Sequence, residues 1–379
     1  MSNPFVELAA PGVRGLHPYQ PGKPVSELAR EHGLADIVKL ASNENPLGPG
    51  EAARAAIESG IADVARYPDG GGFALKAALA AHHSIAPECI TLGNGSNDVL
   101  VLLAEAFLTA DTEAVYSEYA FAVYPIAVQA VGARARVAPA LPPDHPESPL
   151  GHDLDAMAGK LSALTRLVFV ANPNNPTGTW LEASALRRFV ERVPAEALVV
   201  VDEAYFHYVT EDRYPDTTRW LDEFPNLVVT RTFSKAFGLA GLRAGYSLSA
   251  PGVAEILNRV RQPFNMNSLA QLAAIAALGD RAHLAESRRL NRAGLEHVAK
   301  TCQTLGLRYV PSLGNFLLVD FGYPALPVYE ALLREGVIVR PVANYGLPNH
   351  LRITVGLPDE NERLATALRK VVRKAAMRP

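Results

Sequence analysis

Residues 199–205 read VVVDEAY, in which three consecutive valines are followed by Asp202 and, three residues later, by Tyr205. Such a run of β-branched residues is typical of a strand that is buried on both faces. Ligands of open α/β sheets bind outside the carboxyl ends of the strands, so Asp202 is a candidate site residue. Taken alone, a strand that ends in aspartate is equally compatible with a structural or metal-binding role.

Similar apolar runs recur on both sides of this segment and alternate with helical patterns from Pro49 onward. This alternation predicts an α/β fold: a large domain whose mostly parallel sheet is flanked by helices. The other predicted strands are Glu113–Tyr116, Arg166–Ala171, Leu227–Arg231 and Gly245–Leu248, and the five prolines of Ala138–Pro149 predict a surface loop.

The flanks of this region predict two further parts. Residues 1–45 are rich in proline and glycine and read as an N-terminal arm with one short helix around Ser26 to His32. Residues 267–305 read as helical with a break at Gly279. We take this segment as the candidate hinge. The remaining strand and helix patterns predict a smaller C-terminal α/β domain, so we expect an arm (1–45), a large domain (46–266) and a small domain (267–379). The small domain's predicted strands are Phe316–Phe321, Val337–Arg340 and Leu351–Val355, and its predicted helices are Pro327–Glu335 and Asp359–Ala376.

Composition narrows the class of partner. The formal net charge is -3 and no run of Lys or Arg exceeds two residues, which disfavours nucleic acid. No apolar stretch approaches the roughly 18 residues of a membrane span, and the first residues lack the pattern of a signal peptide. The two distant cysteines, Cys89 and Cys302, suit a reducing cytoplasm, and the ten histidines show no metal-ligand spacing. We therefore expect a small-molecule partner and no metal.

The segment TRTFSKAFGLAGLR (230–243) places Lys235 in a small-residue loop directly after a predicted strand. A lysine amine catalyses covalently when it is neutral or condensed as an imine. Thr232, Ser234 and Arg243 could anchor a phosphate beside it, the arginine through a bidentate pair. A solvated loop lysine is the plain alternative.

Two glycine-rich or proline-rich turns complete the set. ANPNNPTG (171–178) demands a turn after a strand and presents Asn175. GNGSND (93–98) precedes a helical pattern over Val99–Leu108, with Ser96 as the expected N-cap. A phosphate suits this helix start, although the third glycine of a dinucleotide-binding motif is absent.

In their order along the chain, the four segments resemble the fold-type-I aminotransferases that depend on pyridoxal 5′-phosphate. The resemblance implies that Lys235 holds the cofactor as a Schiff base, that Asp202 pairs with the pyridine nitrogen, and that Asn175 and Tyr205 donate to the phenolic oxygen. The residues that it assigns to the phosphate cup are Ser96, Asn97, Thr232, Ser234 and Arg243.

Two tyrosines receive roles from the same resemblance. Tyr119, in SEYAFAVY, resembles the aromatic residue that stacks on the cofactor ring, with a core tyrosine as the alternative. Tyr67, in RYPDG, is similar to the tyrosine that reaches the phosphate in the partner subunit. This role implies a homodimer with shared active sites.

The segments LASNENPLG, RYPDG, NPNNPTG, TFSKAFGLAGLR and HLRITVG together resemble the histidinol-phosphate aminotransferases. This resemblance implies the conversion of L-histidinol phosphate and 2-oxoglutarate to imidazole acetol phosphate and L-glutamate, a step of histidine biosynthesis. It assigns Arg352 to the substrate carboxylate and Arg340 to the phosphate of histidinol phosphate. RPVANYGLPNHLRI also resembles a branch that prefers aromatic amino acids, and a decarboxylase of a phosphorylated amino acid shares the scaffold. A non-catalytic regulator is disfavoured because Lys235 and Asp202 are both present.

Overall fold

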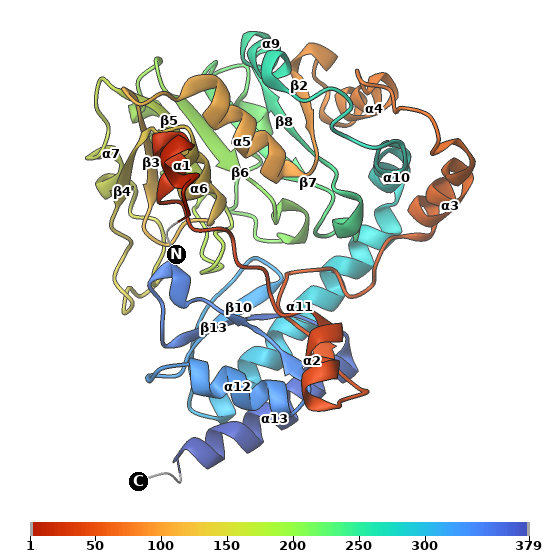
Figure 1. The fold of residues 1–379 in the computed structure, drawn as a ribbon, viewed down its shortest axis with the longest axis vertical. Coiled ribbons are helices and arrows are strands. Elements are labelled where there is room, and N and C mark those ends of the chain that lie inside the picture. The colour runs from red at the N-terminus through yellow and green to blue at the C-terminus, as the bar shows by residue number, and fades with distance from the viewer. Residues whose placement is uncertain (1–2, 377–379) are drawn as a thin grey trace.

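The large part of the molecule is built on a seven-stranded sheet with helices on both sides (Figure 1). The computed structural model describes residues 3–376. Six strands run in the same direction and β8 runs against its two neighbours, which confirms the mostly parallel sheet. In sheet order, the strands are β2 (Ile90–Gly93), β8 (Gly245–Ser249), β7 (Leu227–Thr232), β6 (Leu198–Asp202), β5 (Thr165–Ala171), β3 (Glu113–Ser117) and β4 (Arg134–Ala138).

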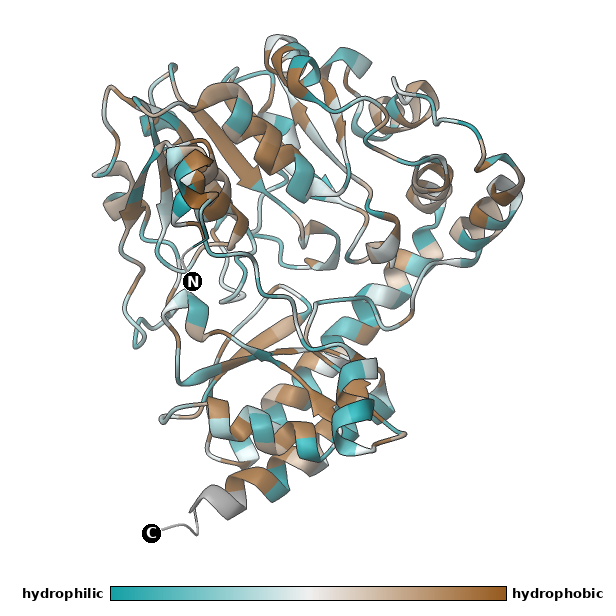
Figure 2. Cartoon of the chain, in the orientation of Figure 1, coloured by the Kyte–Doolittle hydropathy of each residue, from teal (hydrophilic) through white to brown (hydrophobic). Residues whose placement is uncertain are grey.

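Strand periodicity divides the core between the two faces of this sheet. On β6, Val200 packs toward α5, α6 and α9, whereas Val199 and Val201 pack toward α7 and α8. Successive side chains of a strand point to opposite faces, so Asp202 lies on the α5 and α6 side. In Figure 2 the central strand β6 is mostly brown, the colour of hydrophobic residues. The helices are α5 (Ser96–Phe107), α6 (Val123–Ala130), α9 (Pro251–Val260), α7 (Leu154–Ala158) and α8 (Ala183–Arg192).

Two strands of the large sheet escaped prediction. β4 reads RARVA and is mostly exposed, so it lacks the apolar run of a buried strand. β2 has only four residues and ends at Gly93, inside a segment that reads as a turn. The five predicted strands are confirmed, with ends that differ by one residue at most.

The smaller C-terminal part contains a four-stranded antiparallel sheet packed against helices. The long helix α11 runs diagonally from the large part into it (Figure 1). Gly279 ends α10, which confirms the predicted break. The elements are β12 (Arg340–Pro341), β13 (His350–Thr354), β10 (Phe316–Asp320), β9 (Arg308–Val310), α10 (Ser268–Gly279), α11 (Arg281–Thr304), α12 (Leu326–Arg334) and α13 (Pro358–Ala376).

The first part of the chain touches both other parts. Helix α1 (Pro11–Arg14) packs on α6, whereas α2 (Val25–His32) buries Leu28 against residues of the C-terminal part. β1 (Val38–Lys39) then pairs with β11 (Val337–Ile338). Beyond the arm, helices α3 (Glu51–Gly60) and α4 (Phe73–His83) pack against α10 at the β2 edge of the large sheet. Within residues 3–376, no helix is long and apolar enough to cross a membrane.

Candidate active site

A cavity of about 150 Å³ lies where β5, β6 and β7 end and α5 begins. Segments from residues 96 to 243 meet here because parallel strands bring their carboxyl ends to one edge of the sheet. Nine of the predicted site residues line it: Ser96, Asn97, Asn175, Asp202, Tyr205, Thr232, Ser234, Lys235 and Arg243.

Asp202 is buried at the end of β6 and holds several hydrogen bonds. Its two carboxylate oxygens accept from the hydroxyls of Tyr124, at 2.9 Å, and Thr230, at 3.0 Å. Burial raises the pKa of Asp202, and the bonds from Tyr124, Thr230 and the backbone N–H of Ala204 lower it. The sequence around Tyr124, SEYAFAVY, did not predict its contact with Asp202, because the two residues are 78 positions apart in the chain.

Lys235 is half-buried at the wall of the cavity. Its amine donates to the backbone oxygen of Ser42 at 3.4 Å and lies 5.6 Å from the ring centre of Tyr205. Burial and, next, the positive charge of Arg352 lower the pKa of this amine to about 8. The neutral form, which a nucleophile or a proton acceptor must have, is therefore far more populated near neutral pH than in an ordinary lysine, although the protonated form still predominates.

The opposite end of the cavity is built for an anion. Arg243 lies against the start of α5 and donates to the hydroxyl of Ser234 at 3.2 Å. A Cβ atom at Gly95 would lie 2.5 Å from the Arg243 guanidinium, and one at Gly245 would lie 2.1 Å from the Ser96 nitrogen. Both glycines therefore permit the close approach of the arginine and the helix start.

The expected N-cap at Ser96 is wrong. Gly95 is the N-cap of α5, with φ of 83° and ψ of 162°, and Ser96 is the first helical residue. The left-handed φ favours glycine, which explains why the cap is not a serine. The Ser96 side chain is consequently available to the cavity that it lines.

A segment of the arm closes one side of the site. The amide of Asn43 donates to the hydroxyl of Tyr205 at 2.7 Å and accepts from Thr354 of β13. The Asn175 oxygen accepts from Arg352 at 2.6 Å, which directs its nitrogen away from that arginine. Asn43 belongs to the motif LASNENPLG, but the motif alone did not indicate its role. Its contact with the cavity follows from the hydrogen bond to Tyr205, which only the folded chain brings close.

Arg340 and Arg352 are Cα partners on the antiparallel strands β12 and β13. Each side chain is 7% exposed. Their hydrogen bonds go to the backbone oxygens of Gln20 and Ala41 and to the amide of Asn175, and the Nε of Arg352 has no partner among the described residues. Neither arginine is within ion-pair distance of a carboxylate in residues 3–376. Two buried guanidinium groups thus lie together without a neutralising anion.

The structure places the two remaining tyrosines outside the cavity. Tyr119 packs against an apolar cluster beside Leu347, and Phe121 is the aromatic side chain that lines the cavity. The two aromatic residues are separated only by Ala120, so the sequence alone could not choose between them. Tyr67 is 83% exposed and stacks on Phe264 with ring centres 4.8 Å apart.

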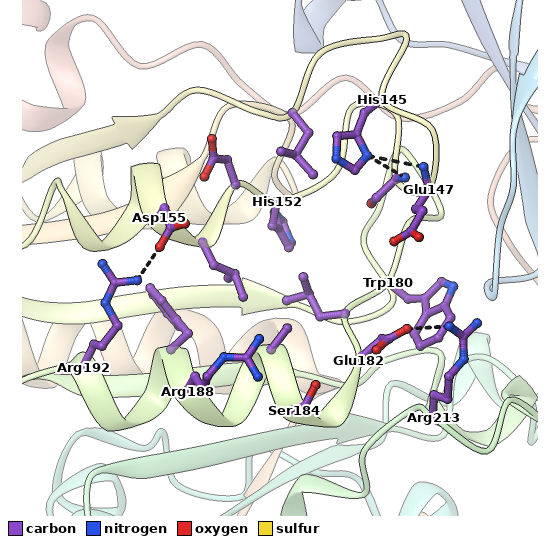
Figure 3. Close-up of a pocket in the computed structure, with 17 residues that line it drawn as sticks. His145, Glu147, His152, Asp155, Trp180, Glu182, Ser184, Arg188, Arg192 and Arg213 are labelled. Carbon is purple, nitrogen blue, oxygen red and sulfur yellow. Dashed lines mark hydrogen bonds and ion pairs between the residues drawn. The ribbon is translucent and has the colours of Figure 1, made fainter.

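A larger hollow of about 680 Å³ lies between α8 and the loop that includes His145 (Figure 3). Its charged lining is partly self-neutralised, because Arg192 pairs with Asp155 and Arg213 with Glu182. None of the predicted site residues lines it. Size alone would therefore select a depression that contains none of the predicted site residues, whereas the smaller cavity brings nine of them together.

Comparisons with known proteins agree with this geometry. Residues 35–368 match the model of the family "Aminotransferase class I and II". A histidinol-phosphate aminotransferase 2 of Pseudomonas fluorescens is 58% identical, over 99% of this chain and 100% of its own. A histidinol-phosphate aminotransferase 1 of Idiomarina loihiensis is 51% identical, over 97% and 98%. The chain belongs to the histidinol-phosphate aminotransferase family.

The solved histidinol-phosphate aminotransferase of Sinorhizobium meliloti, in complex with pyridoxal-5′-phosphate, has a TM-score of 0.87 and 31% identity. The match covers 96% of this chain and 97% of the other. This aminotransferase accordingly depends on pyridoxal phosphate. Its cavity fits the cofactor, since an anion-binding end at Arg243 suits the phosphate and the Asp202 carboxylate suits a basic ring nitrogen.

Proposed function

We propose that the enzyme transfers the amino group of L-histidinol phosphate to 2-oxoglutarate, giving imidazole acetol phosphate and L-glutamate in histidine biosynthesis. The observation that carries this proposal is the pair of buried arginines, Arg340 and Arg352, neither of which forms an ion pair with a carboxylate of residues 3–376. A dianionic phosphate compensates two guanidinium groups better than one carboxylate can. The names of the relatives at 51% to 58% identity support the same substrate.

The proposed roles of the cavity residues follow from their surroundings. Arg243, Ser234, Thr232, Ser96 and Asn97 hold the cofactor's phosphate at the start of α5. Asp202 faces the ring nitrogen, while Tyr205 and Asn175 donate to the phenolic oxygen. Phe121, which lines the cavity, replaces Tyr119 as our candidate for the residue that packs on the ring.

Bound pyridoxal phosphate supplies an aldehyde that condenses with amines and a protonated ring that withdraws electrons from the substrate carbon. Lys235 would hold the cofactor through its side-chain amine. When free, the same amine would accept the proton of the substrate Cα and return it to the bound cofactor. Its pKa of about 8 suits an amine that must both accept and return a proton. The arm residues Ser42 and Asn43, next to Lys235 and Tyr205, restrict the access of water on one side.

Arg340 and Arg352 orient the substrate. Arg352, which also donates to Asn175, binds the carboxylate of glutamate or 2-oxoglutarate. Arg340 binds the phosphate of histidinol phosphate. In each half-reaction a charge-assisted pair between an arginine and the anionic group of that substrate holds the reacting carbon beside Lys235.

One panel tests the substrate. The specificity constant kcat/KM with 2-oxoglutarate is measured for histidinol phosphate, phenylalanine and tyrosine as donors, and carbon dioxide is recorded in parallel. We expect histidinol phosphate to be preferred and glutamate to form without carbon dioxide. A better rate with phenylalanine would support an aromatic aminotransferase, whereas carbon dioxide without glutamate would indicate a decarboxylase.

We further propose a homodimer in which Tyr67 reaches the partner's phosphate site. An exposed apolar surface supports this, since buried subunit contacts favour such side chains. It comprises Ile61, Val64, Tyr67, Phe73 and Phe264.

The division of the chain and its compartment are also proposals. We propose an arm (1–45), a large domain (46–266) and a small domain (267–379). The last of these ranges begins with the hinge segment: its first helix, α10, still packs on α3 and α4 of the large part, so we place the hinge itself at Asp280, after α10. The unpaired Cys89 and Cys302 support a cytoplasmic location.

A further inference from the structure

Tyr124 is a buried tyrosine of α6 whose hydroxyl is aimed at the end of β6. Its side chain has no exposed surface, and its hydroxyl donates to Oδ2 of Asp202 at 2.9 Å. Thr230 donates to the other oxygen, Oδ1, at 3.0 Å. Each oxygen of this carboxylate therefore accepts a hydrogen bond from a hydroxyl group, and the two hydroxyl groups belong to different elements, α6 and β7.

The ring of Tyr124 is fixed by aromatic contacts. It stacks on Phe169 with ring centres 4.7 Å apart and an interplanar angle of 10°. Phe121, which lines the cofactor cavity, meets it edge-on at 5.9 Å. Because these contacts leave the ring little freedom, the direction of the hydroxyl toward Asp202 is set before any ligand binds.

We propose that Tyr124 is a positioning residue that holds the Asp202 carboxylate ionised and oriented toward the cofactor's ring nitrogen, an inference that rests on the role proposed above for Asp202. A carboxylate offers roughly four acceptor sites. The hydroxyls of Tyr124 and Thr230 and the backbone N–H of Ala204 occupy part of this capacity and leave room for one further donor. Because these donors are neutral, they stabilise the carboxylate without placing a positive charge beside it, which would compete with the cofactor's ring nitrogen for the carboxylate.

The other titratable groups around Asp202 act differently. Lys235 is cationic when protonated, and it is also the residue that holds the cofactor. Tyr205 and Tyr214 influence Asp202 through their charge only if they ionise, and burial raises the pKa of both phenols. Tyr124 is thus the buried phenol that contacts the carboxylate directly. Burial also raises its own pKa, so it remains a donor at physiological pH.

The test compares two ligands that differ at the ring nitrogen. Pyridoxal phosphate and its analogue with C–H in place of the ring nitrogen are titrated into apoenzyme, and binding is followed by protein fluorescence. The wild type should bind pyridoxal phosphate more tightly than the analogue. In Tyr124→Phe, which keeps the ring and its stacking, this preference should fall by about tenfold, the effect of one charge-assisted hydrogen bond.

Two further variants separate positioning from packing. Thr230→Val removes the second hydroxyl and should reduce the same preference. Tyr116→Phe is the matched control, because this buried tyrosine lies near Tyr124, with ring centres 6.5 Å apart, and its hydroxyl has no hydrogen-bond partner within the described chain. Its preference should equal that of the wild type. Thermal unfolding of each apoprotein checks that it is folded.

Each outcome decides the proposal. If Tyr124→Phe weakens both ligands equally, Tyr124 has only a packing role and the proposal is overturned. If the wild type itself shows no preference, Asp202 does not act on the ring nitrogen, and its proposed role fails together with that of Tyr124. A reduced preference in Tyr124→Phe and Thr230→Val, with Tyr116→Phe unchanged, supports the proposal.

Discussion

The cofactor cavity and the arginine pair differ in how their buried charges are compensated. At the ends of the parallel strands, Asp202 receives hydrogen bonds from Tyr124 and Thr230. On the small antiparallel sheet, Arg340 and Arg352 are buried as Cα partners, and neither forms an ion pair with a carboxylate in the part of the chain that the structure describes. Their partners are backbone oxygens and one side-chain amide.

This difference corresponds to two kinds of ligand. A resident cofactor is met by groups that are already fixed, because preorganised donors and acceptors need no rearrangement during the reaction. In the proposed function, the anionic groups of the substrates supply the negative charge that the arginine pair lacks, and this charge leaves with the product. Damage to the first region should therefore affect every substrate, and damage to the second should depend on which substrate is present.

Lys235→Ala gives the largest expected effect and tests the first region. Removing the amine that holds the cofactor and moves the proton should lower turnover at least about a thousandfold for every donor. Borohydride reduction should fix the cofactor to the peptide with Lys235 in the wild type and not in the variant. Lys160→Ala, at a partly exposed lysine in the turn after α7, is the control. A variant with near wild-type turnover would remove Lys235 from the mechanism.

Arg340→Ala tests the second region through its dependence on substrate. The half-reaction with histidinol phosphate should lose roughly tenfold to a few hundredfold in rate constant over Michaelis constant, as expected for one charge-assisted pair, and the half-reaction with glutamate should lose less. Single-turnover absorbance measures each half-reaction. Arg334→Ala, an exposed arginine of α12, should change neither. Equal losses in both half-reactions would contradict a specific phosphate role.

In the apoprotein, the protonated amine of Lys235 should lower the free energy of unfolding. The pKa of Lys235 falls from 10.5 to about 8 on folding, so between these values the unfolded chain binds more protons. The amine's contribution to the free energy of unfolding therefore rises with pH across this window. Because the amine is partly exposed, apo Lys235→Met should be more stable than the wild-type apoprotein by about 1–2 kcal/mol near neutral pH.

Denaturant unfolding at several pH values measures this difference. The gap between the two apoproteins should shrink as the pH rises from 8 toward 10.5. Lys160→Met serves as the control for loss of a partly exposed amine. A gap that stays constant with pH would show that Lys235 is not destabilised by its charge.

Tyr67→Phe should have the smallest effect and extends the comparison across subunits. Mixed with Lys235→Ala, it should form heterodimers in which one site carries both changes and the other carries neither. With equal mixing, about a quarter of the sites should regain full activity. Tyr323→Phe, a partly exposed tyrosine remote from this surface, is the control partner. Verified subunit exchange without recovery would place Tyr67 in its own subunit's site or in none.

Local sequence was sufficient for much of the large sheet. Runs such as VVVDEAY and TRTFSKAF predicted the strands and placed Asp202 and Lys235 at their carboxyl ends. This succeeded because burial on both faces requires consecutive apolar residues, a property that each segment carries by itself. β4 escaped because its exposed side chains need no such run.

Only the tertiary structure selected among residues with similar local sequence. It placed Phe121 rather than Tyr119 in the cavity, moved the N-cap from Ser96 to Gly95, and brought Tyr124 to Asp202. It also paired Arg340 with Arg352 across two strands. The sequence determined which polar groups were present and at which strand ends. Their partners were decided by contacts between segments far apart in the chain, because a hydrogen bond depends on distance and direction in space and not on separation in sequence.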